Sequence, residues 1–250
     1  MSKLWIFGDS YGVPYNKNKE VIDWGWTYKL GKSLRVNQYC NCSEIGASNE
    51  YTVNRILKYK NEIAKEDFVV IISTSMMRKW FIPDKPWVSN YQTGKLSNHL
   101  SSVQIDAILN YTEYLHNQKA DIMYFHQFLG WVHYMTDLHD WNVIVIPGFE
   151  EEGYPISHKY QVSGSLFDVC MNEFESSSES EWFYLTHYAD GFDSRLGHLI
   201  KDNHEILSTK LYNTFISNVS LDLHEGFIEK VISKKNINQM EDQFINKKPS

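Results

Sequence analysis

The sequence predicts an α/β protein in which a central parallel sheet of about five strands lies between two layers of helices, giving three α/β/α layers. Short runs of β-branched and aromatic residues alternate along the chain with segments whose apolar residues recur at helical spacing. Glycine and hydroxyl residues directly follow several strand candidates, as expected where strand ends form a ligand site. With 250 residues, the chain is long enough for one substantial core with additional loops.

The first part of the chain predicts two strands of different strength, a helix and a central strand. Lys3–Phe7 is a short apolar run that stops at a Gly-Asp-Ser turn, which indicates the first strand. A weaker candidate covers 36–45, and Ser48 and Asn49 can cap a helix after it. The apolar stripe of this helix consists of Val53, Ile56, Leu57 and Ile63. Phe68–Ile72 is continuous and β-branched, which is typical of a central strand covered on both faces.

The middle of the chain continues the alternation. Residues 84–102 contain proline, glycine, serine and asparagine, and they predict a long surface loop. Helical spacing returns at Ile105, Leu109, Tyr111 and Leu115. Asp121–Phe125 then predicts a fourth strand, or alternatively a continuation of the helix, and Val143–Ile146 predicts a fifth strand. Alternating elements of this kind are typical of a flavodoxin-like domain.

The last part of the chain predicts an excursion and a closing helix. Residues 148–180 are polar and irregular, with a short helix expected at Leu166–Phe174. The final core helix contains Ile206, Leu207, Leu211 and Phe215. We therefore expect one domain over 1–217, followed by a C-terminal helical extension and polar tail over 218–250.

Charge and composition exclude several classes of function. The formal net charge is −7 and no cluster of lysine and arginine is present, which argues against a nucleic-acid partner. The sequence shows no signal peptide and no apolar run near the roughly 20 residues that span a bilayer, so we expect no membrane contact and a cytoplasmic or virion-associated protein. Cys40, Cys42 and Cys170 lack zinc spacing, and no motif indicates a metal or organic cofactor.

Ser10 follows the first strand directly, and its hydroxyl could act as a nucleophile. A serine hydroxyl is a weak nucleophile unless a base removes its proton, so the hypothesis requires a histidine. The best placed of the 10 histidines is His198, just before the closing helix. Asp193 or Asp190 could orient its ring, which would complete a Ser-His-Asp arrangement.

Acyl transfer also needs donors for the developing oxyanion. The backbone N–H groups of Ser10 and Gly46 are candidates, because glycine lets a substrate approach the backbone closely. The residues considered so far do not identify a third oxyanion donor.

The motifs around these residues resemble a known family. Residues 6–11 read Ile-Phe-Gly-Asp-Ser-Tyr and are similar to the GDS block of SGNH (GDSL) hydrolases, and Ile45–Asn49 resembles their glycine block. Gly197–Leu199 with Asn203–Leu207 is similar to the histidine block and closing helix, notably in divergent, virus-encoded members. The resemblance implies a Ser-His-Asp esterase, often a carbohydrate O-deacetylase or a lipid esterase.

The sequence departs from the motifs of this family at two positions that matter for catalytic turnover. The family's Gly-x-Asn-Asp block, which supplies an oxyanion donor, is missing after the central strand, so Thr74, Ser75 or Asn49 would have to substitute. The family's Asp-x-x-His pattern would place its aspartate at position 195, which is Arg195 here. The loss of one oxyanion donor typically lowers the rate by about 100- to 1,000-fold.

The sequence therefore predicts a serine ester hydrolase with Ser10 as nucleophile, His198 as base and Asp193 as the residue that orients it. The expected substrate is a small-molecule or glycan ester. The alternative is a catalytically degenerate SGNH domain that binds a glycan or serves as a structural or assembly module of a virus. Self-association and a virion partner stay open in both cases.

Overall fold

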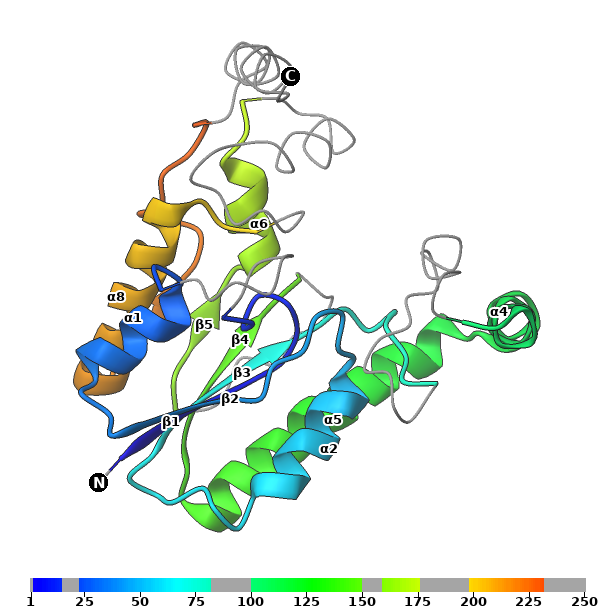
Figure 1. Cartoon of the computed structure of the whole chain (residues 1–250), viewed down its shortest axis with the longest axis horizontal. Coiled ribbons are helices and arrows are strands. Elements are labelled where there is room, and N and C mark those ends of the chain that lie inside the picture. The colour runs from blue at the N-terminus through cyan, green and yellow to red at the C-terminus, as the bar shows by residue number, and fades with distance from the viewer. Residues whose placement is uncertain (1, 15–22, 82–99, 150–158, 176–197, 232–250) are drawn as a thin grey trace, which may run out of the picture. The chain divides into compact units, whose positions relative to one another are not determined.

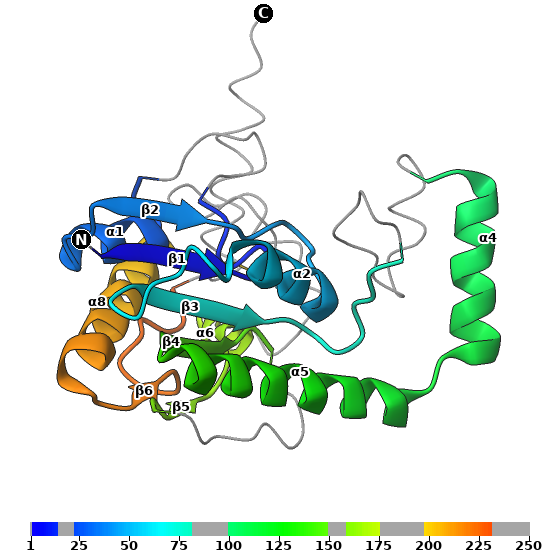
Figure 2. The same cartoon turned by 90° about the horizontal axis from the view of Figure 1, so that it is seen from below.

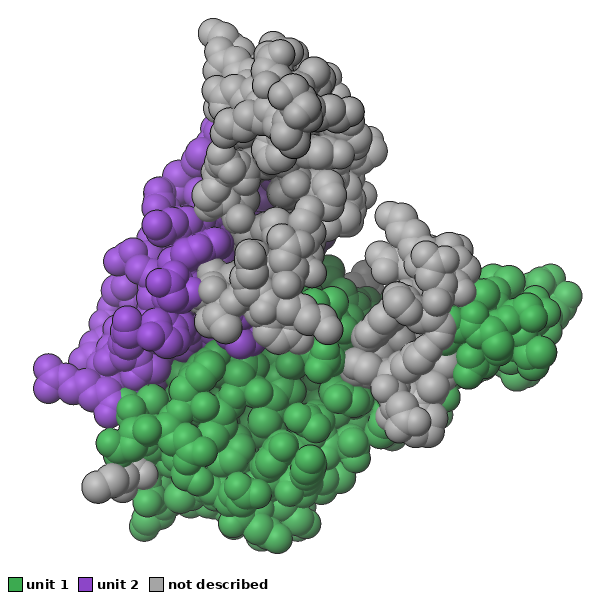
Figure 3. Space-filling model, viewed as in Figure 1, with its two compact units in different colours: residues 1–13, 36–159 green, residues 14–35, 160–250 purple. Residues whose placement is uncertain are grey.

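The computed structural model describes residues 2–14, 23–81, 100–149, 159–175 and 198–231. The chain divides into two compact units, shown in green and purple in Figure 3. Unit 1 consists of Met1–Val13 and Val36–Lys159, and unit 2 of Pro14–Arg35 and Tyr160–Ser250. The expected domain of residues 1–217 includes parts of both units, and its boundary at residue 217 stays a prediction.

Unit 1 is built on a sheet of four parallel strands (Figure 1). They are β1 (Lys3–Phe7), β2 (Gln38–Asn41), β3 (Phe68–Ser73) and β4 (Asn142–Pro147). Their spatial order is β2-β1-β3-β4, with Ile6 opposite both Asn41 and Val70. This is the flavodoxin-like order without its fifth strand. The α/β class with a central parallel sheet is confirmed, and the sheet has four strands, where about five were expected.

The missing strand is explained by helix α5 (Gln118–His139), which takes in residues 121–125. The expectation of a strand there is wrong, and the alternative of a helix is correct. A short apolar run has no clear period of its own. The buried positions of the longer segment recur at helical spacing, and they are Phe125, Phe128, Leu129, Val132 and Met135.

The core of unit 1 forms between the sheet and two helices. Helix α2 (Asn49–Tyr59) and α5 lie side by side on one face of the sheet (Figure 2). Trp5 and Phe7 point into this core, while Leu4 and Ile6 alternate with them and are also fully buried. Both faces of the sheet are therefore covered, as the continuous apolar strands of parallel sheets require.

Helix α4 (Ser102–Asn110) and the π-helical turn η2 (Tyr111–Leu115) confirm the helical spacing expected from residue 105. Ser101 and Gln104 form a capping box that begins α4. The long loop expected at 84–102 falls almost entirely outside the described residues, which resume at residue 100.

Unit 2 contains helices α1 (Trp26–Ser33), α6 (Leu166–Asn172) and α8 (Lys201–Ser217). Helices α1 and α8 pack against each other, and the N–H of Trp26 donates to Nδ1 of His204 at 3.2 Å. The short strands β5 (Val162–Ser163) and β6 (Leu221–Asp222) pair in parallel. Helix α6 and the closing helix α8 confirm two predicted helices.

The described part of the C-terminal extension, residues 218–231, contains β6 and bends but no helix. The helical extension expected there is therefore wrong for these residues, because Leu221 and Leu223 are buried at strand spacing. The excursion expected at 148–180 is described only in part, since 150–158 and 176–197 lie outside the described residues. Among the helices that the structure describes, no helix has the length and apolarity to cross a bilayer.

Candidate active site

The carboxyl ends of the four parallel strands lie at one edge of the sheet, as predicted. The turn after β1 is packed tightly against β3, which explains its glycines. Gly8 has φ +139°, and a Cβ there would lie 2.7 Å from Cβ of Ile72. A Cβ on Gly12 would lie 2.3 Å from Oγ of Ser43. Only glycine allows this turn to sit directly on its neighbours.

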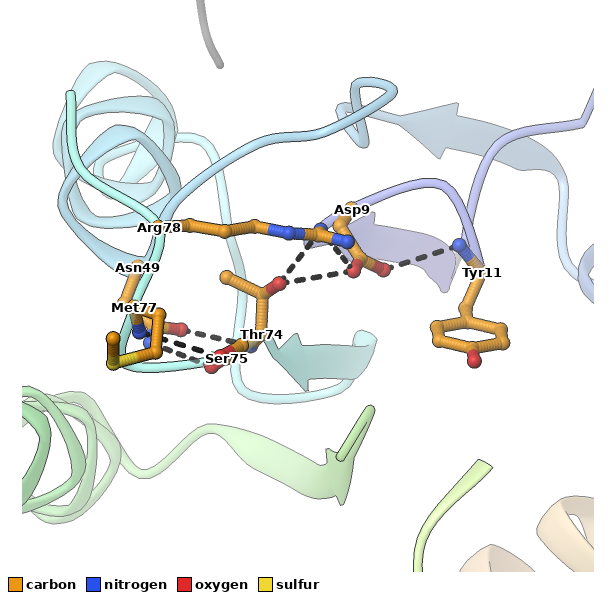
Figure 4. A network of polar contacts seen from close by, with 7 residues as sticks. All are labelled: Asp9, Tyr11, Asn49, Thr74, Ser75, Met77 and Arg78. Carbon is orange, nitrogen blue, oxygen red and sulfur yellow. Dashed lines mark hydrogen bonds and ion pairs between the residues drawn. The ribbon is translucent and has the colours of Figure 1, made fainter. Parts of the chain in front are cut away.

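Asp9 is the centre of a buried polar network at this edge (Figure 4). Its side chain is fully buried, and its Oδ1 accepts a bond from the N–H of Tyr11 at 3.1 Å. Its Oδ2 accepts bonds from Oγ1 of Thr74 at 3.0 Å and from Nη1 of Arg78 at 2.7 Å. A buried carboxylate is stable only when it is paired and hydrogen-bonded, and Asp9 meets both conditions.

Arg78 therefore joins the turn after β1 to the segment after β3. The same Nη1 atom donates to Oγ1 of Thr74 at 2.7 Å, and the guanidinium lies 5.2 Å from the ring centre of Phe149. Arg78 was not among the predicted site residues. The available signal was Asp9 itself, because an aspartate in a turn between buried strands requires a cation or several donors nearby.

Asn49 begins α2 and binds the backbone of Thr74 with both ends of its amide. Its Oδ1 accepts from the N–H of Thr74 at 2.9 Å, and its Nδ2 donates to the carbonyl of Thr74 at 2.9 Å. Two predicted oxyanion residues are thus brought together, and the Thr74 N–H is occupied. The second hydrogen of Nδ2 remains for another acceptor, since an amide nitrogen carries two.

Ser10 lies in the turn fixed by Asp9 and is half-buried. Its carbonyl accepts from the N–H of Val13 at 3.3 Å, which closes the turn. Gly46 follows β2, the strand next to β1, and has φ +72°, a left-handed conformation that favours glycine. Ser75 follows Thr74, and its Oγ accepts from the N–H of Met77 at 3.2 Å.

His198 belongs to unit 2, where it is buried just before α8. Asp190, Asp193 and Arg195 lie outside the described residues. Ser10 and His198 are in different units, so their pairing and the choice of aspartate stay predictions.

Glu173 anchors the backbone beside His198. It is fully buried, and its Oε1 accepts from the N–H of Ile200 at 3.0 Å and from Nδ2 of Asn203 at 2.8 Å. Burial raises the pKa of this carboxyl to about 8, and the two donated hydrogen bonds oppose the rise. At neutral pH Glu173 is therefore mostly protonated, which makes its burial tolerable.

The described residues contain no group of three or more metal-ligating side chains. No protein-family model matches the chain, and no curated protein matches it.

Among solved structures, the chain is similar to a protein of Desulfitobacterium hafniense DCB-2 that is described as lipolytic and of the G-D-S-L family. The identity is 12%, over 86% of this chain and 100% of that one, with a TM-score of 0.35. It is also similar to phospholipase A1 from Streptomyces albidoflavus NA297, with 10% identity, 87% and 74% coverage and a TM-score of 0.32. A third similar structure is an extracellular lipase from Streptomyces rimosus, with 11% identity, 89% and 80% coverage and a TM-score of 0.31. All three are lipolytic by description, but likenesses this remote carry no argument about the reaction.

Proposed function

We propose that this protein is a serine ester hydrolase in which Ser10 is the nucleophile. The observation that carries the proposal is the buried Asp9 network, which fixes the turn bearing Ser10 at the carboxyl edge of the sheet. In sheets of this class, ligands bind at that edge. A turn held by an ion pair and a side-chain hydroxyl keeps the nucleophile in one position, which effective catalysis requires.

In the proposed reaction, Oγ of Ser10 attacks the carbonyl carbon of an acyl ester while His198 takes the hydroxyl proton. Asp193 or Asp190 orients the histidine. The tetrahedral intermediate collapses, the alcohol leaves with the proton from His198, and water then hydrolyses the acyl-serine by the same route. Acyl ester and water thus give acid and alcohol.

The proposed oxyanion donors are the N–H groups of Ser10 and Gly46, with Asn49 as the third. Asn49 is favoured over Thr74 and Ser75 for a structural reason. The Thr74 N–H is bonded to Asn49, and the Thr74 hydroxyl is bonded to Asp9, whereas the Asn49 amide retains a second hydrogen. Asn49 would thus replace the asparagine of the missing Gly-x-Asn-Asp block.

The second candidate is a degenerate domain that binds a glycan or acts as an assembly module, including in a virion. The observation that favours it is in the sequence, where Arg195 stands at the position of the family's aspartate. Both candidate functions use the same edge of the sheet, so a measurement of esterase activity distinguishes them.

The test compares wild type with Ser10→Ala on p-nitrophenyl acetate and acetylated glycans, together with labelling by a fluorophosphonate. We expect Ser10→Ala to lose activity by at least about 1,000-fold and to lose the label. The matched control is Ser217→Ala, which removes an exposed hydroxyl at the end of α8 and leaves both readouts unchanged. Equal rates in Ser10→Ala and wild type, with no Ser10-dependent label, would replace the hydrolase with the second candidate.

A further inference from the structure

A cavity of about 480 Å³ lies in unit 1 between α2, the segment after β3, η2 and α5. This volume is within the range of sites that hold small molecules. Asn49 and Arg78 line it and also belong to the network around Asp9. The cavity therefore begins one side chain away from the turn that carries Ser10.

The walls of this cavity are mainly aromatic and apolar. Phe125 and Phe128 are buried on α5, and Trp131 continues their row at the next helical position. Tyr111 and Tyr124 line the cavity nearer the solvent, and Tyr124 is 53% exposed. Four of these rings are held by one long helix, so the wall is largely pre-formed.

The charged groups of the cavity are paired with opposite charges. Nζ of Lys79 lies 2.7 Å from Oδ1 of Asp121, and Nε2 of His116 lies 2.6 Å from Oδ2 of the same carboxylate. Nζ of Lys79 also lies 5.3 Å from the ring centre of Tyr124 and 3.8 Å from Oε1 of Glu50. Asp121 is 2% exposed, so this cluster is a fixed part of the cavity wall.

The pairing of these charged side chains determines which class of ligand the cavity can bind. Recognition of a sugar depends on polar groups that can exchange bonds with water for bonds with hydroxyls. Here the charged candidates are already committed, because Lys79 is paired with Asp121 and Arg78 with Asp9, and the remaining Nδ2 hydrogen of Asn49 is the proposed oxyanion donor. An anion would likewise find both cations balanced. A neutral aromatic ring gains edge and face contacts with the five aromatic side chains that line the cavity, and it displaces none of these ion pairs and hydrogen bonds.

We infer that this cavity binds the neutral aromatic ring of the substrate, so that the ester hydrolysed at Ser10 carries an aryl acid or an aryl alcohol. The inference rests on the proposed function only for the statement that the bound molecule is a substrate. The binding of the ring itself is a property of the cavity.

The test measures binding of N-(2-naphthyl)acetamide, a neutral amide that mimics a naphthyl ester, by calorimetry with the full chain. We expect wild type and Ser10→Ala to bind it equally. Trp131→Ala and Tyr124→Ala should weaken binding by about 10-fold, as the loss of an aromatic contact and its buried area predicts. Tyr124 is exposed, so its substitution leaves folding intact even if that of Trp131 does not. Tyr134→Ala is the matched control, since Tyr134 is exposed on the same helix outside the cavity.

N-hexylacetamide and N-acetylglucosamine test the ligand class, and we expect each to bind at least about 10-fold more weakly. Equal or tighter binding of either would overturn the aromatic assignment. Absence of naphthyl binding, or binding that neither Trp131→Ala nor Tyr124→Ala weakens, would overturn the site.

The two proposals fail in different ways. Naphthyl binding without Ser10-dependent hydrolysis of 2-naphthyl acetate, p-nitrophenyl acetate or acetylated glycans would uphold the site and overturn the hydrolase. Ser10-dependent hydrolysis of p-nitrophenyl acetate without naphthyl binding would uphold the hydrolase and overturn the site.

Discussion

The ion pair between Asp9 and Arg78 should be strongly coupled in a double-mutant cycle of Asp9→Asn and Arg78→Met. The Asp9 side chain is fully buried and that of Arg78 is 21% exposed. At an effective dielectric constant of about 20, unit charges about 4 Å apart attract by about 4 kcal/mol. Removing one partner leaves the other uncompensated, which costs about 3–5 kcal/mol for a buried pair. The double variant removes both charges, so we expect a coupling energy of about 2–3 kcal/mol.

Urea unfolding followed by tryptophan fluorescence and by circular dichroism measures these free energies, provided that the two signals change together. The control cycle is Lys29→Met with Glu205→Gln, a pair at 2.6 Å whose side chains are 27% and 67% exposed. Solvent screens such a pair, and we expect no measurable coupling. A coupling for Asp9 and Arg78 no larger than that of the control would refute the conclusion that burial makes this pair the anchor of the Ser10 turn.

Two further predictions concern the backbone of the turn and the buried carboxyl of unit 2. Gly8→Ala should destabilise the protein by more than about 2 kcal/mol because of its positive φ and the contact with Ile72, whereas Gly130→Ala, in open space on α5, should stabilise it by about 0.5–1 kcal/mol. Equal thermal shifts for the two variants would contradict this. The raised pKa of Glu173 means that its contribution to stability is full below about pH 4.5 and is lost as pH rises through about 8, by up to about 5 kcal/mol. Glu173→Gln keeps an oxygen for Ile200 and Asn203 and should flatten this decline between pH 5.5 and 8.5 in urea unfolding. An unchanged slope would show that another group causes the decline.

The order of elements could be predicted from the sequence wherever the signal was local. β1, β3 and β4 are continuous apolar runs bounded by turn residues, and α8 shows helical spacing over several turns. Residues 121–125 were ambiguous because a run of this length fits a strand or one turn of a helix equally well. The cavity could not be predicted from the sequence for the same reason, because Phe125 and Trp131 lie on one wall only when this segment is helical.

What the sequence by itself determined was the position of the Ser10 turn and its place at the carboxyl edge of a parallel sheet. The strand and the turn that follows it are adjacent in the chain, so the local sequence pattern suffices to place that turn. Only the tertiary structure decided that Arg78 neutralises Asp9 and that Asn49 holds Thr74. These partners are separated by 69 and 25 residues, and nothing local to either distinguishes them from a surface charge or a helix cap. Their roles follow from burial, because a carboxylate or amide out of water must find its partners among whichever residues the fold brings near.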